Sequence, residues 1–405
     1  MSQTSNLGVL SGGLRHVVLF GKTGSGKSSI FHQLVEGNKK IELGYTQGGS
    51  KYSPVVGLCK LGQAGDITVI DTAGLDDVDE LGNEQARRTR NVIRRADIAI
   101  YVIDIQEFDR AAYKRAHDWL ERNMIPYLQV FNHCDETYVG DIARLKMEFP
   151  DAIFISTRTP GSISLLRARL SQMVRTIKVR EAPQVPGGLV KPGDYVLLLA
   201  PHGNKEIMIS QHKIVNELVN RGVRCVVIDE NDLEATMKEI PRIDLVIAYA
   251  RSFGIARDII PESIPLTSYS LLNALQSGVL EEFFDGAAAI GKLNKDSCVL
   301  IAEDNEHNGT FHDIGRIKIP RALRKLAGEE LHIDYITGLD LPDDIDQYDL
   351  VIHDAGLTMT PRSVQARVSI CHEAGVPIAN YGTILAALCG ITSRCKKVLL
   401  PDSEG

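Results

Sequence analysis

The residues best able to do chemistry lie in a glycine-rich stretch near the amino terminus. Residues 21–28 read GKTGSGKS, a Gly followed after four residues by Gly-Lys-Ser. This spacing is typical of a loop whose backbone N–H groups surround phosphates, with a helix N-terminus behind it. We expect Lys27 to reach the β- and γ-phosphates and the Ser28 hydroxyl to bind Mg²⁺. The other predicted nucleotide contacts here are Gly21, Thr23, Gly24, Ser25, Gly26 and Ser29.

The elements around this loop fit the same interpretation. The apolar run Val17–Phe20 before it predicts a buried strand, and Ser29–Leu34 after it predicts the first turns of a helix. A strand–loop–helix order is the context that a phosphate-binding loop requires.

A second set of polar residues follows the predicted strand Ile67–Ile70. Residues 71–74 read DTAG, the pattern D-x-x-G. We expect Asp71 to hold the Mg²⁺ ion through water and the Gly74 amide to sense the γ-phosphate, with Thr72 as a further nucleotide contact. Lys27, Asp71 and Gly74 are therefore the predicted catalytic residues.

Two later strand ends carry the residues expected to read the base. Asn132, His133 and Asp135 follow the predicted strand Tyr127–Phe131, and Ser156 and Thr157 follow Ala152–Ile155. Asp135 can accept hydrogen bonds from the N1–H and the exocyclic amine of guanine, which adenine does not offer. Four elements in this order, each at a strand end, predict a GTP-binding domain.

Three positions depart from the usual pattern of such domains. His133 stands where a Lys is usual, which alters the support over the base. Thr46 or Ser50 could supply the first-switch ligand to Mg²⁺, and the sequence does not choose between them. Leu75 rather than Gln follows Gly74, so the sequence predicts slow hydrolysis of GTP to GDP and phosphate.

Composition narrows the class of protein. The chain has 405 residues, 44% of them hydrophobic, and a net charge of −7, so nucleic acid is not an expected partner. No run approaches a membrane span, and residues 1–13 look like a flexible lead without the plan of a signal peptide. Seven dispersed cysteines predict reduced thiols in the cytoplasm.

Strand and helix patterns alternate along the whole chain, which predicts an α/β protein. A P-loop GTPase domain with a doubly wound, mostly parallel sheet is expected over 14–180, and two smaller Rossmann-like α/β domains follow it. The Pro- and Gly-rich segment 181–190 is the predicted linker, before domains at 191–294 and 295–405. The apolar stretch Leu271–Leu293 exceeds what one small sheet needs, which suggests burial against another subunit.

The later domains resemble a known family. Residues 313–320 (DIGRIKIP), 351–353 (VIH), 374–378 (AGVPI) and 380–382 (NYG) look like the carboxyl domain of the FeFe-hydrogenase maturation GTPase, HydF. Residues 191–194 (KPGD) and 264–268 (IPLTS) resemble that family's middle dimerisation domain, and 71–77 (DTAGLDD) its second switch. The resemblance implies a homodimer formed through the middle domain, and a client metalloenzyme or its maturation factors as partners.

The family also binds a 4Fe-4S cluster through a C-x-H element and a distant H-C-x-x-C element. These fall here on Asn305 and His307, and on His353, Asp354 and Leu357, so none of the three thiolates is present. Because iron–sulfur clusters are held by thiolates, a cluster is not expected. Asn305, His307, His353 and Asp354 could instead bind Zn²⁺, Mn²⁺, Fe²⁺ or an anion, or be a polar remnant.

The predicted function is accordingly a GTP-binding, GTP-hydrolysing maturation or assembly scaffold of the HydF type without a 4Fe-4S cluster. Two alternatives remain open at this point. One is a hydrogenase maturase that builds its cluster on unusual ligands, and the other is a nearly inert nucleotide-sensing interaction protein.

Overall fold

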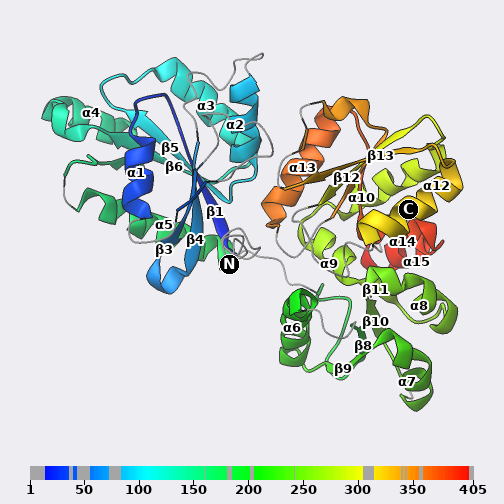
Figure 1. Cartoon of the computed structure of the whole chain (residues 1–405). Helices are drawn as coiled ribbons and strands as arrows, with labels where there is room; N and C mark the ends of the chain where they lie inside the picture. Colours follow the sequence, from blue (N-terminus) through cyan, green and yellow to red (C-terminus); the bar gives the residue numbers. More distant parts are fainter. Residues whose placement is uncertain are drawn as a thin grey trace, which may run out of the picture. The chain divides into compact units, whose positions relative to one another are not determined.

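The computed structural model describes residues 14–35, 40–42, 55–72, 84–159, 161–179, 185–200, 205–240, 242–303, 314–338, 341–342, 344–354 and 359–400. The chain divides into two compact units, residues 1–180 and 181–405 (Figure 1).

The first unit is built on a seven-stranded sheet in the order β2-β3-β4-β1-β5-β6-β7. β2 and β3 pair antiparallel, as do β3 and β4, while the remaining neighbours are parallel. The strands are β1 (Arg15–Phe20), β2 (Lys40–Glu42), β3 (Val55–Lys60), β4 (Asp66–Asp71), β5 (Ile98–Asp104), β6 (Tyr127–Asn132) and β7 (Ile153–Phe154). The predicted doubly wound, mostly parallel sheet is confirmed.

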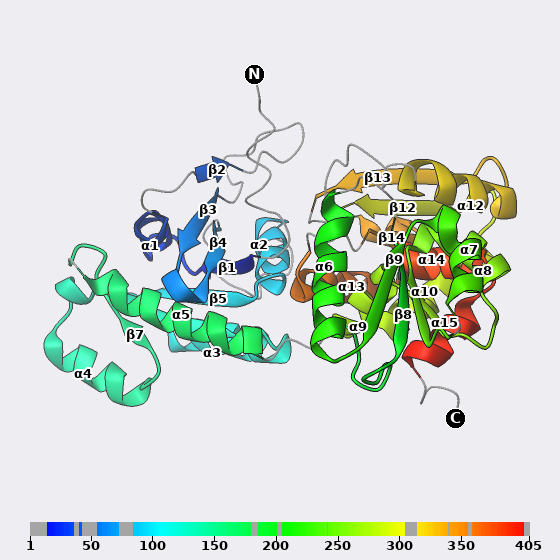
Figure 2. The same ribbon diagram turned by 90° about the horizontal axis from the view of Figure 1, so that it is seen from below.

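Helices cover both faces of this sheet because its central strands are apolar on both sides. Val17 and Leu19 of β1 pack with the helices α1 and α5, whereas Val18 and Phe20 pack with α2 and α3 (Figures 1 and 2). Alternation along a strand sends successive side chains to opposite faces. The helices are α1 (Lys27–Leu34), α2 (Glu84–Arg94), α3 (Arg110–Arg122), α4 (Val139–Glu148) and α5 (Ser162–Val179), with short 3-10 turns η2 (Gly62–Ala64) and η3 (Cys134–Glu136).

The second unit contains two four-stranded parallel sheets. The middle sheet has the order β11-β10-β8-β9. Its strands are β8 (Tyr195–Leu199), β9 (Arg224–Ile228), β10 (Leu245–Ala248) and β11 (Leu266–Ser268). Its helical segments are α6 (Lys205–Asn220), η4 (Glu230–Asp232), α7 (Leu233–Glu239), η5 (Ala250–Ser252), α8 (Phe253–Ile259) and α9 (Tyr269–Gln276).

The third sheet has the order β13-β12-β14-β15. Its strands are β12 (Cys298–Glu303), β13 (His332–Thr337), β14 (Leu350–His353) and β15 (Ile378–Asn380). Its helical segments are α10 (Leu280–Ala287), η6 (Ala288–Lys292), the π-helix η7 (Ile314–Lys318), α12 (Ile319–Ala327), η8 (Ile345–Gln347), α13 (Pro361–Glu373), α14 (Tyr381–Leu388) and α15 (Thr392–Leu399). The described residues therefore form three sheets rather than one large one, as the sequence predicts.

The two sheets of the second unit share one hydrophobic core. Helix α10 packs against β15 of the same chain and buries Leu280, Phe283 and Phe284 there, whereas Ile290 and Leu293 at the end of the apolar stretch Leu271–Leu293 are only partly buried. A Cβ at Gly286 would lie 1.8 Å from the carbonyl oxygen of Ile378, so only glycine allows this close approach. Val185 and Val190, from the predicted linker, are also buried in this core.

Candidate functional site

The phosphate-binding loop joins β1 to α1. The Lys27 side chain folds back over this loop and contacts its backbone. The Lys27 ammonium donates hydrogen bonds to the carbonyl oxygens of Gly21 (2.9 Å) and Lys22 (2.7 Å), and the side chain is buried. The Ser25 hydroxyl in the same loop is buried and has no hydrogen-bond partner among the described residues. A buried hydroxyl without a partner is costly, so this loop is shaped to receive a further polar group.

Ser28 and Asp71 meet at the start of α1 and the end of β4. The Ser28 hydroxyl donates to Oδ2 of Asp71 at 2.6 Å, while the buried Oδ1 lacks a partner in the described part of the chain. Burial raises the pKa of Asp71, and the Ser28 hydrogen bond and the Lys27 charge oppose that rise. A hydroxyl and a carboxylate oxygen are the hard ligands that Mg²⁺ takes, so these two residues fit the ion and would hold it.

Asn132 connects the phosphate-binding loop to the loop after β7. Its amide nitrogen donates to the carbonyl oxygen of Ser25 (3.0 Å), and its amide oxygen accepts from the Thr157 N–H (3.3 Å). The side chain is fully buried, and a Cβ at Gly26 would lie 2.1 Å from its nitrogen. Gly26, at φ 92°, therefore gives Asn132 the room to hold the two loops together.

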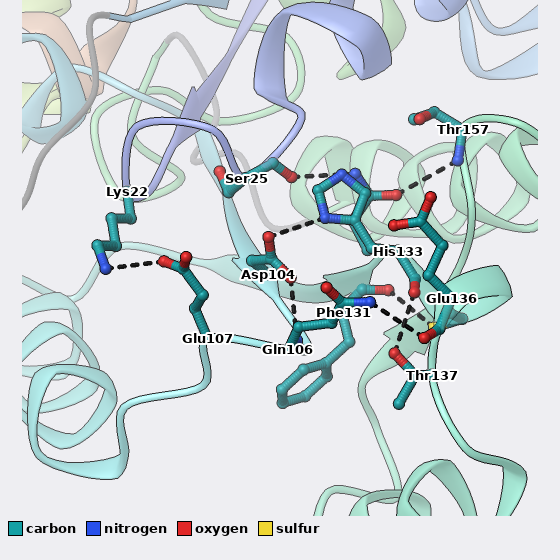
Figure 3. Close-up of polar contacts among 12 residues, drawn as sticks. Lys22, Ser25, Asp104, Gln106, Glu107, Phe131, His133, Glu136, Thr137 and Thr157 are labelled. Carbon is teal, nitrogen blue, oxygen red and sulfur yellow. Dashed lines mark hydrogen bonds and ion pairs between the residues drawn. The ribbon is translucent and has the colours of Figure 1, made fainter.

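His133 lies beside the same loop, held by a residue that sequence reasoning missed. Its backbone is left-handed (φ 66°), and its Nδ1 lies 2.9 Å from Oδ2 of Asp104, at the end of β5 (Figure 3). Asp104 and Asn132 are register partners on adjacent parallel strands. The sequence signal that could have identified Asp104 is its position at the end of an apolar strand, because the carboxyl ends of parallel strands meet at the ligand-binding edge.

Asp135 is fixed by the loop after β7. A hydrogen bond from Ser156 lowers the pKa of Asp135, and the Arg158 charge adds to the effect. The Arg158 guanidinium lies 3.9 Å from the Asp135 carboxylate and pairs with Glu136. An ionised, partly exposed acceptor thus stands beside the buried Ser156 at the end of the sheet, which is what recognition of a guanine edge requires.

The remaining predicted residues fall into three groups. Thr23, Gly24 and Ser29 lie exposed on the loop and α1. Thr72 is buried and its hydroxyl donates to the carbonyl oxygen of Leu19 (2.9 Å), so this side chain ties β4 to β1. The predictions for Gly74, Thr46, Ser50, Asn305 and His307 fall outside the described residues.

In the third sheet, His353 and Asp354 lie at the carboxyl end of β14, beside β12. The chain runs from β12 to β13 on one side and then crosses to β14 on the other side of β12. The gap between the ends of β12 and β14 is therefore the topological switch point of the sheet. Both residues are buried, and the Asp354 N–H donates to the carbonyl oxygen of Ala302. These two residues thus lie at an edge where α/β sheets commonly bind ligands.

The surroundings of His353 decide its chemistry. Nδ1 lies 2.7 Å from a guanidinium nitrogen of Arg367, which is fully buried and also donates to the carbonyl oxygens of Ala302 (3.2 Å) and Gly338. A guanidinium only donates, so Nδ1 accepts. Burial and the Arg367 charge hold the pKa of His353 well below its usual range. Nδ1 is therefore bound to Arg367, whereas Nε2 is buried without a hydrogen-bond partner among the described residues.

Glu303, at the carboxyl end of β12, is paired within the same domain. The Arg316 guanidinium donates to both carboxylate oxygens of Glu303, with its Nε at 3.0 Å from Oε2 and a terminal nitrogen at 2.5 Å from that oxygen. Arg316 also lies over the Tyr335 ring, 4.0 Å from its centroid. This edge of the third sheet is therefore occupied by two arginines with partners in the protein.

Comparison with protein families assigns all three parts of the chain. Residues 16–133 match a model described as a 50S ribosome-binding GTPase. Residues 185–278 match the hydrogen maturase F dimerization domain, and 281–398 match the hydrogen maturase F tetramerization domain. The fold and the site thus define a P-loop GTPase domain followed by two α/β oligomerisation-type domains. The chain is a HydF-like family member, as its sequence motifs predict.

Individual relatives are similar over little more than a third of the chain. GTPase Der of Xanthomonas oryzae pv. oryzae is 30% identical over 145 residues, 35% of this chain and 30% of the relative. The tRNA modification GTPase MnmE of the same organism is 31% identical over 161 residues, 39% of this chain and 33% of the relative. The chain thus spans about a third of these proteins. The cytosolic domain of the T. maritima FeoB iron transporter has a TM-score of 0.34 at 17% identity, covering 40% of this chain and 65% of that one.

No helix in the described ranges has the length and apolar character needed to cross a membrane.

Proposed function

We propose that this protein binds GTP and hydrolyses it slowly, and that it serves as a HydF-type maturation scaffold without a 4Fe-4S cluster. The observation that carries the proposal is the meeting of Ser28 and Asp71 at 2.6 Å, beside Lys27, with Oδ1 of Asp71 buried and without a partner among the described residues. This arrangement would place the positive charge of Lys27 and a Mg²⁺ site beside the phosphates of a bound nucleotide.

The chemistry in this proposal is positioning and charge neutralisation rather than covalent catalysis. Lys27 would exchange its loop carbonyl contacts for phosphate oxygens, and the Gly74 amide would contact the γ-phosphate. Mg²⁺, when bound by Ser28 and Asp71, supplies neutralising charge at the phosphates. Leu75 cannot orient a water molecule as Gln would, which is the reason to expect slow turnover.

Selectivity for guanine would come from Asp135, with Ser156 holding its carboxylate. Asn132 contributes by fixing the distance between the phosphate-binding loop and the base-reading loop, rather than by a free amide of its own. His133, held by Asp104, would lie against the base in place of the usual Lys.

The residues at the third sheet do not fit a 4Fe-4S cluster. Asn305, Asp354 and Leu357 stand where the family has cysteines, and Nδ1 of His353 is bound to Arg367. A cluster needs thiolate ligands. The donor chemistry thus supports a scaffold whose cargo or client is not bound through such a cluster.

Homodimer formation through residues 191–294, a client metalloenzyme or maturation factor, and a cytoplasmic location complete the proposal. The matches to dimerization and tetramerization domains support an oligomer, and the seven free cysteines are consistent with a reducing compartment.

The test is nucleotide binding and hydrolysis by the full-length protein with Mg²⁺. Wild type should bind a fluorescent GDP analogue and release phosphate from GTP but not from ATP. Lys27→Ala should weaken nucleotide binding about 100-fold or more, because it removes a charge aimed at the phosphates. The matched control is Lys22→Ala, which removes an exposed lysine of the same loop that pairs with Glu107. Equal loss in both variants, or no binding by wild type, would refute the GTPase assignment.

Iron and sulfide analysis after anaerobic reconstitution tests the missing cluster. We expect iron far below about four atoms per chain. Stoichiometric iron with sulfide would restore the reading as a cluster-carrying maturase.

A further inference from the structure

We propose that Cys298, His332 and Asp334 form a Zn²⁺ site at the amino-terminal edge of the third sheet. β12 and β13 are parallel neighbours, with Cys298 opposite His332 and Leu300 opposite Asp334. Residues two apart on a strand point to the same face. The register therefore places a thiol, an imidazole and a carboxylate on one face of two adjacent strands.

The distances between the three donor atoms are close to those of a bound metal. The Cys298 sulfur, a His332 ring nitrogen and an Asp334 carboxylate oxygen all lie within 4.8 Å of one another. Nε2 of His332 and Oδ1 of Asp334 are 3.0 Å apart. Ligand bonds of about 2.0–2.1 Å in a tetrahedral zinc site separate such atoms by about 3.3 Å, so a small movement admits the ion.

Neighbouring residues already hold two of the three ligands. The Tyr348 hydroxyl donates to Oδ2 of Asp334 at 3.1 Å, which leaves Oδ1 facing His332. Asp349 holds the Cys298 backbone from both sides: its carboxylate accepts from the Cys298 N–H (2.8 Å), and its own N–H donates to the Cys298 carbonyl oxygen (2.8 Å). Outer hydrogen bonds of this kind orient metal ligands and tune affinity.

The donor set selects the ion. A thiolate and an imidazole favour Zn²⁺ over Mg²⁺ or Ca²⁺, and three protein ligands leave a fourth position for water. The His332 side chain is 67% exposed and that of Asp334 is 42% exposed, so the ion can enter from solvent. Metal binding should release a proton, because zinc binds the thiolate and not the thiol.

This site is separate from the edge where the HydF cluster motif falls. Cys298 begins β12, and Glu303 ends it. Five steps of about 3.3 Å place the two ends about 17 Å apart. The proposal depends neither on GTP hydrolysis nor on the residues that replace the cluster cysteines.

Metal titration of the chelator-treated, full-length protein in excess Mg²⁺ tests the site. Zn²⁺ should bind with a stoichiometry of one ion per chain in competition with a chromophoric chelator, and proton release should accompany binding. Co²⁺ should give a thiolate-to-cobalt charge-transfer band, because Cys298 is a ligand.

The variants separate this site from adventitious binding. Cys298→Ser should abolish the cobalt band and weaken Zn²⁺ binding at least about tenfold, and Tyr348→Phe should weaken it about tenfold while keeping the band. Cys389→Ser, a partly buried cysteine elsewhere in the same unit, should change neither. His332→Ala alters an exposed side chain and serves as the test if Cys298→Ser fails to fold. Absence of saturable Zn²⁺ binding, or a band that persists in Cys298→Ser, would overturn the proposal.

Discussion

The carboxyl edges of the GTPase sheet and of the third sheet offer an instructive comparison. Both gather polar side chains where parallel strands end. At the first edge, the Ser25 hydroxyl and Oδ1 of Asp71 are buried without a partner among the described residues. At the third sheet, Arg367 and Arg316 bond to carbonyl oxygens, His353 and Glu303, while Nε2 of His353 and the Tyr381 hydroxyl are buried without a hydrogen-bond partner among the described residues. The first edge therefore leaves its expected metal-ligand oxygen open, whereas the third edge is partly filled by its own arginines.

The largest expected effect is on the stability of the second unit. Arg367→Met should lower its free energy of unfolding by about 3 kcal/mol or more, because two carbonyl oxygens and a ring nitrogen lose a charged donor in a buried position. Urea denaturation measures the change. Arg321→Met, which alters an exposed arginine on α12, is the matched control and should be nearly neutral. A small loss for Arg367→Met would mean that this edge is not stabilised by its arginine.

At the first edge, Asp71→Asn should impair activity without lowering stability. Removing a carboxylate from the predicted Mg²⁺ site should slow Mg²⁺-dependent GTP hydrolysis about 100-fold. Stability without nucleotide should stay the same or rise at neutral pH. The raised pKa means that folding disfavours the ionised form, so Asp71 contributes stability only in acid and loses it as pH increases. Hydrolysis assays and thermal unfolding give the two readouts; parallel loss of both would contradict the comparison.

His353 should make the second unit sensitive to acid. Its folded-state pKa lies well below that of the unfolded chain. The unfolded state therefore takes up a proton first as pH falls below about 6.5, and stability decreases by at most about 1.4 kcal/mol per pH unit until the folded histidine also protonates.

His353→Gln should flatten this dependence in urea titrations between neutral and acid pH. His16 in the first unit also has a lowered pKa because of burial, so His16→Gln is the control and should leave the second unit's profile unchanged. An unaltered slope in His353→Gln would show that another group titrates there.

The smallest effect is expected at the base-reading loop. His133→Lys should strengthen GDP binding several-fold, because a permanent cation would then face Asp104, 2.9 Å from the present ring nitrogen. Fluorescence titration with a GDP analogue checks the gain. In Asp104→Asn the gain from His133→Lys should shrink; an equal gain in both backgrounds would exclude coupling between the two positions.

The sequence signals for the GTPase site are local. The loop at 21–28, Asp71, and Asn132 with Asp135 lie directly after apolar strands, and the parallel sheet brings those strand ends together. The same reasoning missed Asp104, β5 and the antiparallel strand β3, which carry no recognised motif. Hydrophobicity alone does not say which surface a helix covers, and only the structure shows that α10 packs on β15.

The sequence by itself determined the class of the chain: its alternation of strands and helices, its phosphate-binding loop, and the absence of cysteines at the cluster positions. Only the tertiary structure decided how individual groups are used. Arg367 lies 14 residues from His353, and Cys298 meets His332 only through strand register. Burial and distant partners set the pKa of His353 and the neighbours of the Cys298 thiol, and both arise from packing that no local motif encodes.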